Sequence, residues 1–146
     1  MIVREAKRTD IDKLVALGIE FANVSQASHG FNVSEKKIRL FTQEIIGKDD
    51  WINLVLEDEG KIKGILAGVV NTPFFSEDIL AQEVFWYVQE GGKEGLKLMF
   101  QFEILAKQRG CKKISFGYKP AFVDMKVIFD RMGYRLMESQ YIKDVR

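Results

Sequence analysis

The sequence predicts a mixed α/β sheet in a single domain. A run of β-branched and aromatic residues at 80–88 stops at a glycine-rich turn, which is followed at once by a helical run and another strand. Two extended runs before it are separated by a short turn. A helix that joins two strands of one sheet makes a crossover, so those two strands should be parallel in an otherwise largely antiparallel sheet. The 146 residues, 47% of them hydrophobic, are enough for one core, and we expect one domain over residues 1–146.

The first part of the chain predicts a strand at 2–6 and then two helices. Thr9 is expected to cap the first helix, with Asp12 completing a capping box, because apolar residues follow at helical spacing. A loop should cover 23–32. Ser34 is placed to cap the second helix, and Gly47 to end it.

A hairpin comes next, with strands at 51–57 and 61–71 around a turn at 58–60. Gly64 and Gly68 lie two residues either side of Leu66, so one face of the second strand carries little bulk. Such a face allows another element to pack closely against it.

The remaining elements are expected at 80–88 (strand), 94–109 (helix), 112–118 (strand), 122–132 (helix) and 134–142 (strand). The helix at 94–109 is apolar on most of its circumference, which is typical of a helix packed against a sheet. The complete sheet is therefore flanked by four helices.

The glycine-rich turn is a candidate site for an anion. Unpaired N–H groups at a helix start, close backbone approach at Gly91 and Gly92, and the cation of Lys93 together suit a pyrophosphate. Glu90 and Glu94 oppose this interpretation, and a flexible connector without ligand is the alternative.

Composition excludes several other classes. The 22 basic and 21 acidic residues nearly balance, so we expect neither nucleic acid nor a membrane surface as partner. The N-terminal residues contain no apolar run typical of a signal peptide, which predicts a cytoplasmic protein. The single cysteine, Cys111, is interpreted as structural, and the single histidine, His29, as a loop residue. No metal site is expected.

Over nearly its full length the chain resembles the GNAT superfamily of N-acetyltransferases, in particular compact bacterial and phage members. The resemblance rests on the start at 2–12, the Phe-Trp-Tyr-Val before the glycine turn, the Ala-Lys-Gln-Arg-Gly-Cys-Lys-Lys-Ile at 106–114 and the Phe-Asp-Arg-Met-Gly-Tyr at 129–134. It implies a GNAT-like fold and direct transfer of an acetyl group from acetyl-CoA to a primary amine, without a metal.

In that family the turn resembles Gln or Arg, two residues, Gly, one residue, and Gly or Ala. The pattern fits imperfectly in two registers. From Gln89, Gly92 matches but Glu94 stands at the last small position. From Glu90, which we prefer, Gly95 matches and Lys93 replaces the first glycine. Phe129 stands where the family often has a tyrosine that protonates the thiolate, and Phe122 where it frequently has an asparagine. The cofactor-binding residues implied by the resemblance are Trp86, Tyr87, Val88, Gly91, Gly92, Lys93, Glu94, Gly95 and Leu96.

Two side chains are candidates for catalysis. Glu83 lies on the strand expected beside the thioester, in alternation with Val84, Trp86 and Val88, and half burial there would raise its pKa toward that of a useful general base. An exposed carboxylate is the alternative. Tyr118 could protonate the departing thiolate, although an aromatic residue at a strand end also packs on a core; Tyr87 is a weaker candidate.

Aromatic residues could line a pocket for the acceptor, or belong to the core: Trp51, Phe74, Phe75, Phe85 and Trp86. Phe74 and Phe75 are neighbours in a loop and could form a lid or a homodimer contact. The leading hypothesis is an N-acetyltransferase for a small-molecule or peptide amine. The alternative is a non-catalytic domain of the same fold with a binding, assembly or regulatory role.

Overall fold

The computed structural model describes the chain except residues 27, 28, 90, 119–123 and 146. Its elements are β1 (Ile2–Glu5), a 3₁₀ turn (Arg8–Asp10), α1 (Ile11–Phe21), a π-helical turn (Ala22–Gln26), α2 (Glu35–Ile45), β2 (Trp51–Asp58), β3 (Lys61–Asn71), β4 (Leu80–Val88), α3 (Glu94–Gln108), β5 (Lys113–Ser115) and α4 (Lys126–Arg131). Most of these elements match the sequence-based expectations to within a few residues.

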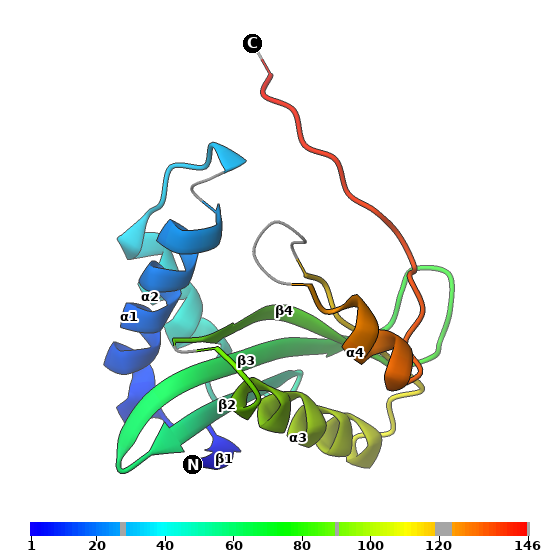
Figure 1. The fold of residues 1–146 in the computed structure, drawn as a ribbon, viewed down its shortest axis with the longest axis horizontal. Helices are drawn as coiled ribbons and strands as arrows, with labels where there is room; N and C mark the ends of the chain where they lie inside the picture. Colours follow the sequence, from blue (N-terminus) through cyan, green and yellow to red (C-terminus); the bar gives the residue numbers. More distant parts are fainter. Residues whose placement is uncertain (27–28, 90, 119–123, 146) are drawn as a thin grey trace.

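The five strands form one sheet in the order β1-β2-β3-β4-β5 (Figure 1). Neighbouring strands are antiparallel except β4 and β5, which are parallel, as the crossover through α3 requires. This confirms the predicted mixed sheet with one parallel pair.

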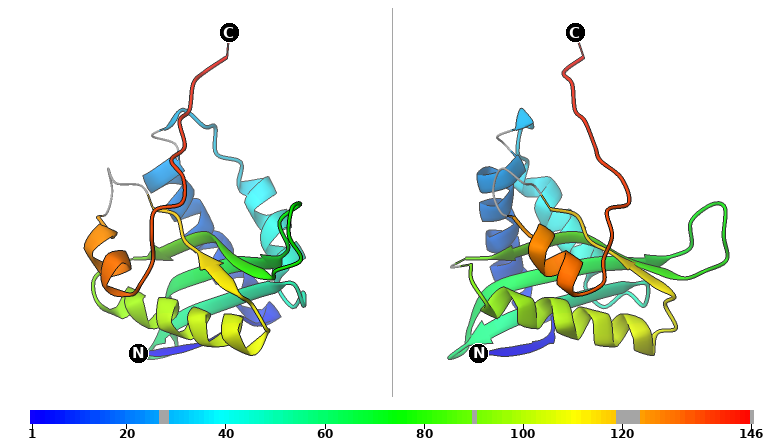
Figure 2. Two further views of the ribbon diagram at one scale, coloured as in Figure 1. Left: turned by 90° about the vertical axis from the view of Figure 1, so that its right-hand side faces the viewer. Right: turned by 45° about the vertical axis from the view of Figure 1, so that its right-hand side comes forward.

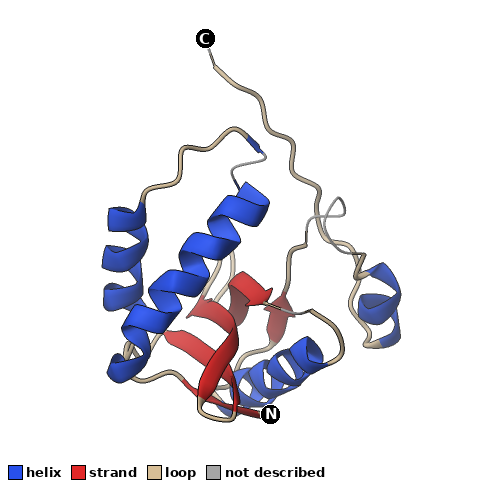
Figure 3. Ribbon diagram, turned by 60° about the vertical axis from the view of Figure 1, so that its left-hand side comes forward, coloured by secondary structure: helices blue, strands red, loops and turns tan. Residues whose placement is uncertain are grey.

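Helices cover both faces of the sheet. Figure 3 shows α1 and α2 together on one side of the strands and α3 on the other. One core cluster joins α3 to alternate residues of β2, among them Leu54 and Leu56, while a second joins α1 and α2 to Val55 and its neighbours. Successive side chains of β2 point to opposite faces of the sheet, so alternate residues pack in the two different core clusters.

The hairpin between β2 and β3 forms as the sequence predicts. Glu59 and Gly60 both have positive φ, 50° and 78°, and Asp58 pairs directly with Lys61. Two residues with positive φ are typical of the tight hairpin turn that matches strand twist.

The expected close packing on β3 occurs at Gly68. A Cβ on this residue would lie 2.5 Å from Cζ of Phe102 and 2.9 Å from the carbonyl oxygen of Gln82. Phe102 is fully buried in α3, so the missing side chain of Gly68 brings α3 against the sheet.

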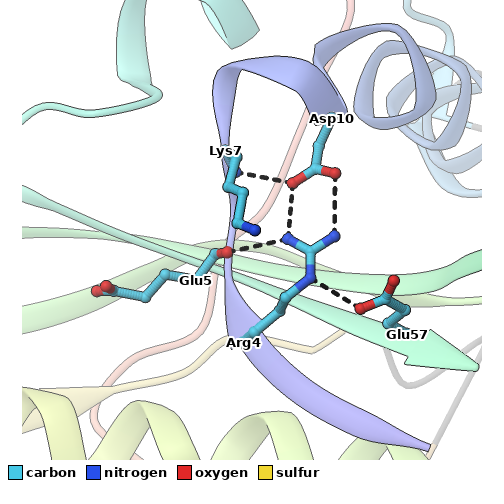
Figure 4. A network of polar contacts seen from close by, with 5 residues as sticks. All are labelled: Arg4, Glu5, Lys7, Asp10 and Glu57. Carbon is cyan, nitrogen blue, oxygen red and sulfur yellow. Dashed lines mark hydrogen bonds and ion pairs between the residues drawn. The ribbon is translucent and has the colours of Figure 1, made fainter. Parts of the chain in front are cut away.

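The first helix begins differently from the prediction. Neither Thr9 nor Asp12 caps it; instead Asp10 accepts the backbone N–H of Lys7 at 2.7 Å and receives two hydrogen bonds from Arg4, at 2.8 and 3.0 Å (Figure 4). Arg4 also donates to Glu57 at 2.9 Å. The guanidinium of Arg4 on β1 thus holds the carboxylate of Asp10 at the start of the helix. The spacing of residues within the helix does not reveal such a tertiary contact.

The second helix confirms the prediction at its start. The Ser34 hydroxyl accepts the backbone N–H of Lys37 at 3.2 Å, and Gly47 follows the last turn with φ 83°. Ile45 is buried on the face turned to the sheet.

The end of the chain departs most from expectation. β5 has three residues rather than seven, and α4 begins at Lys126; Phe122 lies outside the described residues. The strand expected at 134–142 is wrong: residues 135–145 form no strand, and the segment runs away from the sheet (Figures 1 and 2). A segment with strand-like composition forms a strand only where its backbone can pair with the edge of a sheet. Residues 135–145 lie away from the sheet of their own chain.

Candidate active site

The parallel strands β4 and β5 separate after a short contact. Their ladder joins Leu80 to Lys113, Ala81 to Ile114 and Gln82 to Ser115, and the pairing stops there. Beyond Gln82, β4 continues to Val88 while paired with β3 alone among the described residues. The other edge of β4 therefore offers unpaired backbone groups near Glu83 and beyond.

One carboxylate bridges this opening. Oε1 of Glu83 on β4 accepts a hydrogen bond of 3.0 Å from the backbone N–H of Gly117, two residues after β5. Burial raises the pKa of Glu83 to about 7, although the bond from Gly117 acts in the opposite direction. Glu83 is thus half-buried and close to the pKa that a general base needs at neutral pH.

An extra residue in β4 decides which face Glu83 occupies. The register with β3 shifts between Phe85 and Glu83, so Val84 has no opposite residue. Ala81 and Trp86, five residues apart, consequently pack on the same core cluster beneath α3. Glu83 pairs with Gly68, which faces α3, and lies on that face too. The regular alternation expected through Val84 was wrong.

Tyr118 comes directly after Gly117, the donor to Glu83, so the two catalytic candidates are brought to the same opening. The Tyr118 side chain is half-buried, with its ring 5.7 Å from that of Phe129. Phe129 is buried with Met99 and Met125 and serves the core.

Tyr87 lies on the other face of β4. Its ring is 5.9 Å from Phe21 of α1, and burial together with the carboxylate of Glu20 raises the pKa of its hydroxyl. Since Glu83 faces α3, the side chain of Tyr87 does not share its side of the sheet.

The glycine turn has the geometry that an anion would use. Gly91 and Gly92 have φ of 63° and 81°, and a Cβ on either would meet nothing within 4 Å. Gly95 is different, because a Cβ there would lie 3.2 Å from the side chain of Val88. Two glycines thus leave open space at the helix start, and the third lets α3 approach β4.

The backbone amides of the turn divide into two groups. Gly91, Gly95 and Leu96 donate to backbone carbonyls of Val88, Gly92 and Lys93, at 3.3, 3.3 and 3.1 Å. The N–H groups of Gly92, Lys93 and Glu94 have no backbone acceptor within the described part of the chain. These three are the amides that a phosphate could engage.

The charges at the turn are partly neutralised. Glu94 forms an ion pair of 2.6 Å with Lys97 on its own helix, and this contact lowers the pKa of Glu94. Lys93 is exposed at the position before the helix. Glu90 lies outside the described residues.

Most of the aromatic residues considered for the acceptor pocket belong to the core. Trp51 packs edge-on against Phe41, and Phe85 lies 5.5 Å from Phe21. Phe74 and Phe75 are the exceptions, with exposed fractions of 101% and 72% in the loop between β3 and β4.

Two features of the candidate site were not predicted from the sequence. The Gly117 amide that holds Glu83 was missed, although a glycine after a short strand could have indicated it. Phe116 was also missed: its ring lies 5.6 Å from Trp86 and 5.4 Å from Phe102, so it fills the space where β4 and β5 diverge.

No metal-binding cluster is present among the residues that the structure describes. Within that same part of the chain, no helix has the length and apolar character needed to cross a membrane.

Comparison with solved structures decides the fold. A GNAT family acetyltransferase from Staphylococcus aureus superposes with a TM-score of 0.69 at 20% identity, covering 99% of this chain and 98% of that one. This chain has the GNAT fold. An aminoglycoside acetyltransferase from an uncultured soil sample, in complex with sisomicin, shares the GNAT fold with a TM-score of 0.68 and 18% identity, over 99% and 94% of the two chains.

The same fold occurs in a protein described as a transcriptional regulator from Bacillus halodurans C-125, at a TM-score of 0.77 and 17% identity over 99% of both chains. Scans against protein-family models and against curated proteins found no match. Function must therefore be argued from this chain's own residues.

Proposed function

We propose that this protein is an N-acetyltransferase that transfers the acetyl group of acetyl-CoA directly to a primary amine of a small molecule or peptide. The observation that carries the proposal is Glu83, a half-buried carboxylate with a pKa of about 7, held where β4 and β5 separate. We place the protein in the cytoplasm, where acetyl-CoA is made available by metabolism.

The reaction needs a base because an alkyl ammonium is mostly protonated at neutral pH. Removing its proton costs roughly 4 to 5 kcal/mol from the difference between pH 7 and a lysine-like pKa. Glu83 accepts this proton, directly or through a water molecule. A carboxylate with an ordinary pKa would be a much weaker acceptor at the same pH.

The freed amine attacks the carbonyl carbon of the thioester, and a C–N bond forms. Negative charge develops on the carbonyl oxygen, and the unpaired edge of β4 around Trp86 to Val88 supplies backbone N–H groups for it. The C–S bond then breaks, and the CoA thiolate takes a proton from the hydroxyl of Tyr118. No covalent enzyme intermediate is required.

The turn before α3 binds the pyrophosphate of acetyl-CoA. The amides of Gly92, Lys93 and Glu94 supply donors at the positive end of the helix, and the ammonium of Lys93 adds charge. The open space beside Gly91 and Gly92 admits the phosphates without a steric clash.

Thermal unfolding with and without acetyl-CoA tests the binding part of this proposal. A ligand at ten times its Kd stabilises the folded state by about 1.4 kcal/mol, which corresponds to a rise of about 5 °C in Tm for a chain of this size. A screen of amines, peptides and aminoglycosides with a free-thiol readout tests transfer. No shift at millimolar acetyl-CoA and no thiol release would contradict the proposal.

The alternative is a non-catalytic GNAT domain with a binding, assembly or regulatory role. It is favoured by Phe129, which packs in the core where the family often has a tyrosine, and by the neighbour described as a transcriptional regulator. A thermal shift without thiol release from any amine would support this alternative.

A further inference from the structure

A buried carboxylate on α3 and a buried phenol after α4 face each other. Burial raises the pKa of Glu103, and the hydroxyl of Tyr134 offsets part of this effect. Burial and the Glu103 carboxylate both raise the pKa of Tyr134, so its hydroxyl keeps its proton at neutral pH. Oε1 of Glu103 and the hydroxyl oxygen of Tyr134 make no hydrogen bond of regular geometry to any described residue. Since buried polar atoms are costly without a partner, a small shift that joins the two is favourable.

The ring of Tyr134 belongs to an aromatic cluster around Phe116. Its centroid lies 5.7 Å from that of Phe116, with the planes at 77°, and 5.3 Å from that of Phe129. The rings of Trp86 and Phe102 lie 5.6 and 5.4 Å from Phe116. Aromatic pairs at such distances prefer particular orientations, so these contacts restrict where Phe116 can lie.

The position of Phe116 determines the position of the donor to Glu83. The peptide group that follows Phe116 carries the N–H of Gly117, which donates to Oε1 of Glu83 at 3.0 Å. β5 ends at Ser115, and the described ladder with β4 ends there too. Because the peptide group is planar, a displacement of Phe116 carries the Gly117 amide with it. Side-chain packing therefore holds this amide against Glu83.

We propose that Tyr134 and Glu103 form a hydrogen-bonded pair that positions the amide of Gly117 and, through it, the carboxylate of Glu83. The O–H of Tyr134 donates to Glu103 and ties the aromatic cluster to α3, so that Phe116 and the following amide stay in place. Tyr134 and Glu103 are thus positioning residues. Their importance for acetyl transfer rests on the proposed function of Glu83 as the base, whereas the positioning itself is a property of the folded protein.

The pKa of Glu83 reports on the position of the amide. Burial raises this pKa, and the hydrogen bond from Gly117 lowers it. No charged side chain in the described part of the chain adds a third influence. If the amide moves away, burial acts alone, and the pKa of Glu83 rises above its value of about 7.

NMR titration without any ligand tests the positioning. The carboxyl ¹³C signal of Glu83, assigned by its absence in Glu83→Gln, gives the pKa, and the amide proton of Gly117 should titrate with the same midpoint. Tyr134→Phe keeps the ring and removes the hydroxyl. We expect it to raise the pKa of Glu83 by about 0.5 and to reduce the pH-dependent shift of the Gly117 amide by about half. Tyr141→Phe changes a tyrosine that is 95% exposed and should leave both signals as in the wild type.

Variants of Glu103 distinguish positioning from packing. Glu103→Gln retains an oxygen that accepts from Tyr134 and should keep the wild-type pKa of Glu83, whereas Glu103→Leu should raise it as Tyr134→Phe does. The double variant of Tyr134→Phe and Glu103→Leu should show no larger shift than either single variant, because both changes remove the same interaction. A lower Tm with an unchanged pKa of Glu83 in the two single variants would show a role in core packing alone and would overturn the proposal.

The titrations also distinguish this proposal from the proposed enzyme activity. If no amine causes thiol release but Glu83 titrates as expected in the variants, the positioning is supported and the transferase proposal alone fails. If thiol is released while Glu83 has the same pKa in the wild type, Tyr134→Phe and Glu103→Leu, the positioning proposal alone fails.

Discussion

The carboxylate of Glu83 accepts a 3.0 Å hydrogen bond from the backbone N–H of Gly117, across the point where β4 and β5 part. This bond fixes the orientation of the side chain while burial raises its pKa to about 7. A single amide thus holds the carboxylate that we propose as the base, without stabilising its negative charge enough to restore an ordinary pKa.

Glu83→Gln should stabilise the protein above neutral pH. The folded pKa of Glu83 is raised above its unfolded value of 4.5, so the wild type loses stability as pH rises through about 7. Glutamine avoids the buried charge and still accepts from Gly117. We expect a Tm about 3 °C higher than wild type at pH 8, and no difference at pH 4.5. Glu77→Gln, an exposed residue in the β3–β4 loop, is the control; equal effects of the two variants would contradict this account.

Lys93→Ala should weaken acetyl-CoA binding, because the variant loses a cation beside the free amides of the turn. We expect an increase in Kd of about threefold, or 0.7 kcal/mol, measured by calorimetry, and a smaller effect at high salt. Lys107→Ala, at the other end of α3, should leave Kd unchanged. Similar losses in both variants would indicate a general charge effect rather than the proposed turn.

Gly68→Ala should destabilise the protein by about 2 kcal/mol, since the added methyl group overlaps a buried ring. Its Cβ would lie 2.5 Å from Cζ of Phe102. Phe102→Leu removes that atom, so the double variant should unfold at a higher denaturant concentration than the sum of the single effects predicts. Strict additivity would show that Phe102 does not limit the space at Gly68.

Arg4→Met should cost about 2 kcal/mol because it leaves the buried carboxylate of Asp10 without its charged partner. The Arg4 contact lowers the pKa of Asp10 below its usual 3.8, so the wild type is stabilised above pH 4 and loses this contribution as pH falls below it. The free energy of unfolding, measured with urea at pH 7 and at pH 3, should change less between the two pH values in the variant than in the wild type. Arg39→Met breaks the exposed pair with Asp12 and should cost less than about 0.5 kcal/mol.

Local patterns were sufficient for much of the fold. The Ser34 cap, the Glu59-Gly60 turn and the crossover through α3 each depend on residues close in sequence. The final strand was wrong because strand formation depends on which edge is available, and residues 135–145 meet none in this structure.

The candidate site was predicted less completely. The residue type and strand position of Glu83 identified it as a candidate. The face of the sheet on which it lies was not predicted, because the extra residue Val84 can be recognised only from the pairing of β4 with β3. The donor Gly117 lies 34 residues away and becomes a neighbour through the parallel pairing of β4 and β5. Spacing along one strand carries no information on such contacts.

The most direct test of the account is the pH dependence of thiol release from acetyl-CoA, measured with a transferred amine for the wild type and Glu83→Gln. We predict that wild-type kcat/KM rises through a step with an apparent pKa near 7, and that the variant lacks this step and is slower by about 100-fold. The same profile and rate in both proteins would contradict a role for Glu83 as the base.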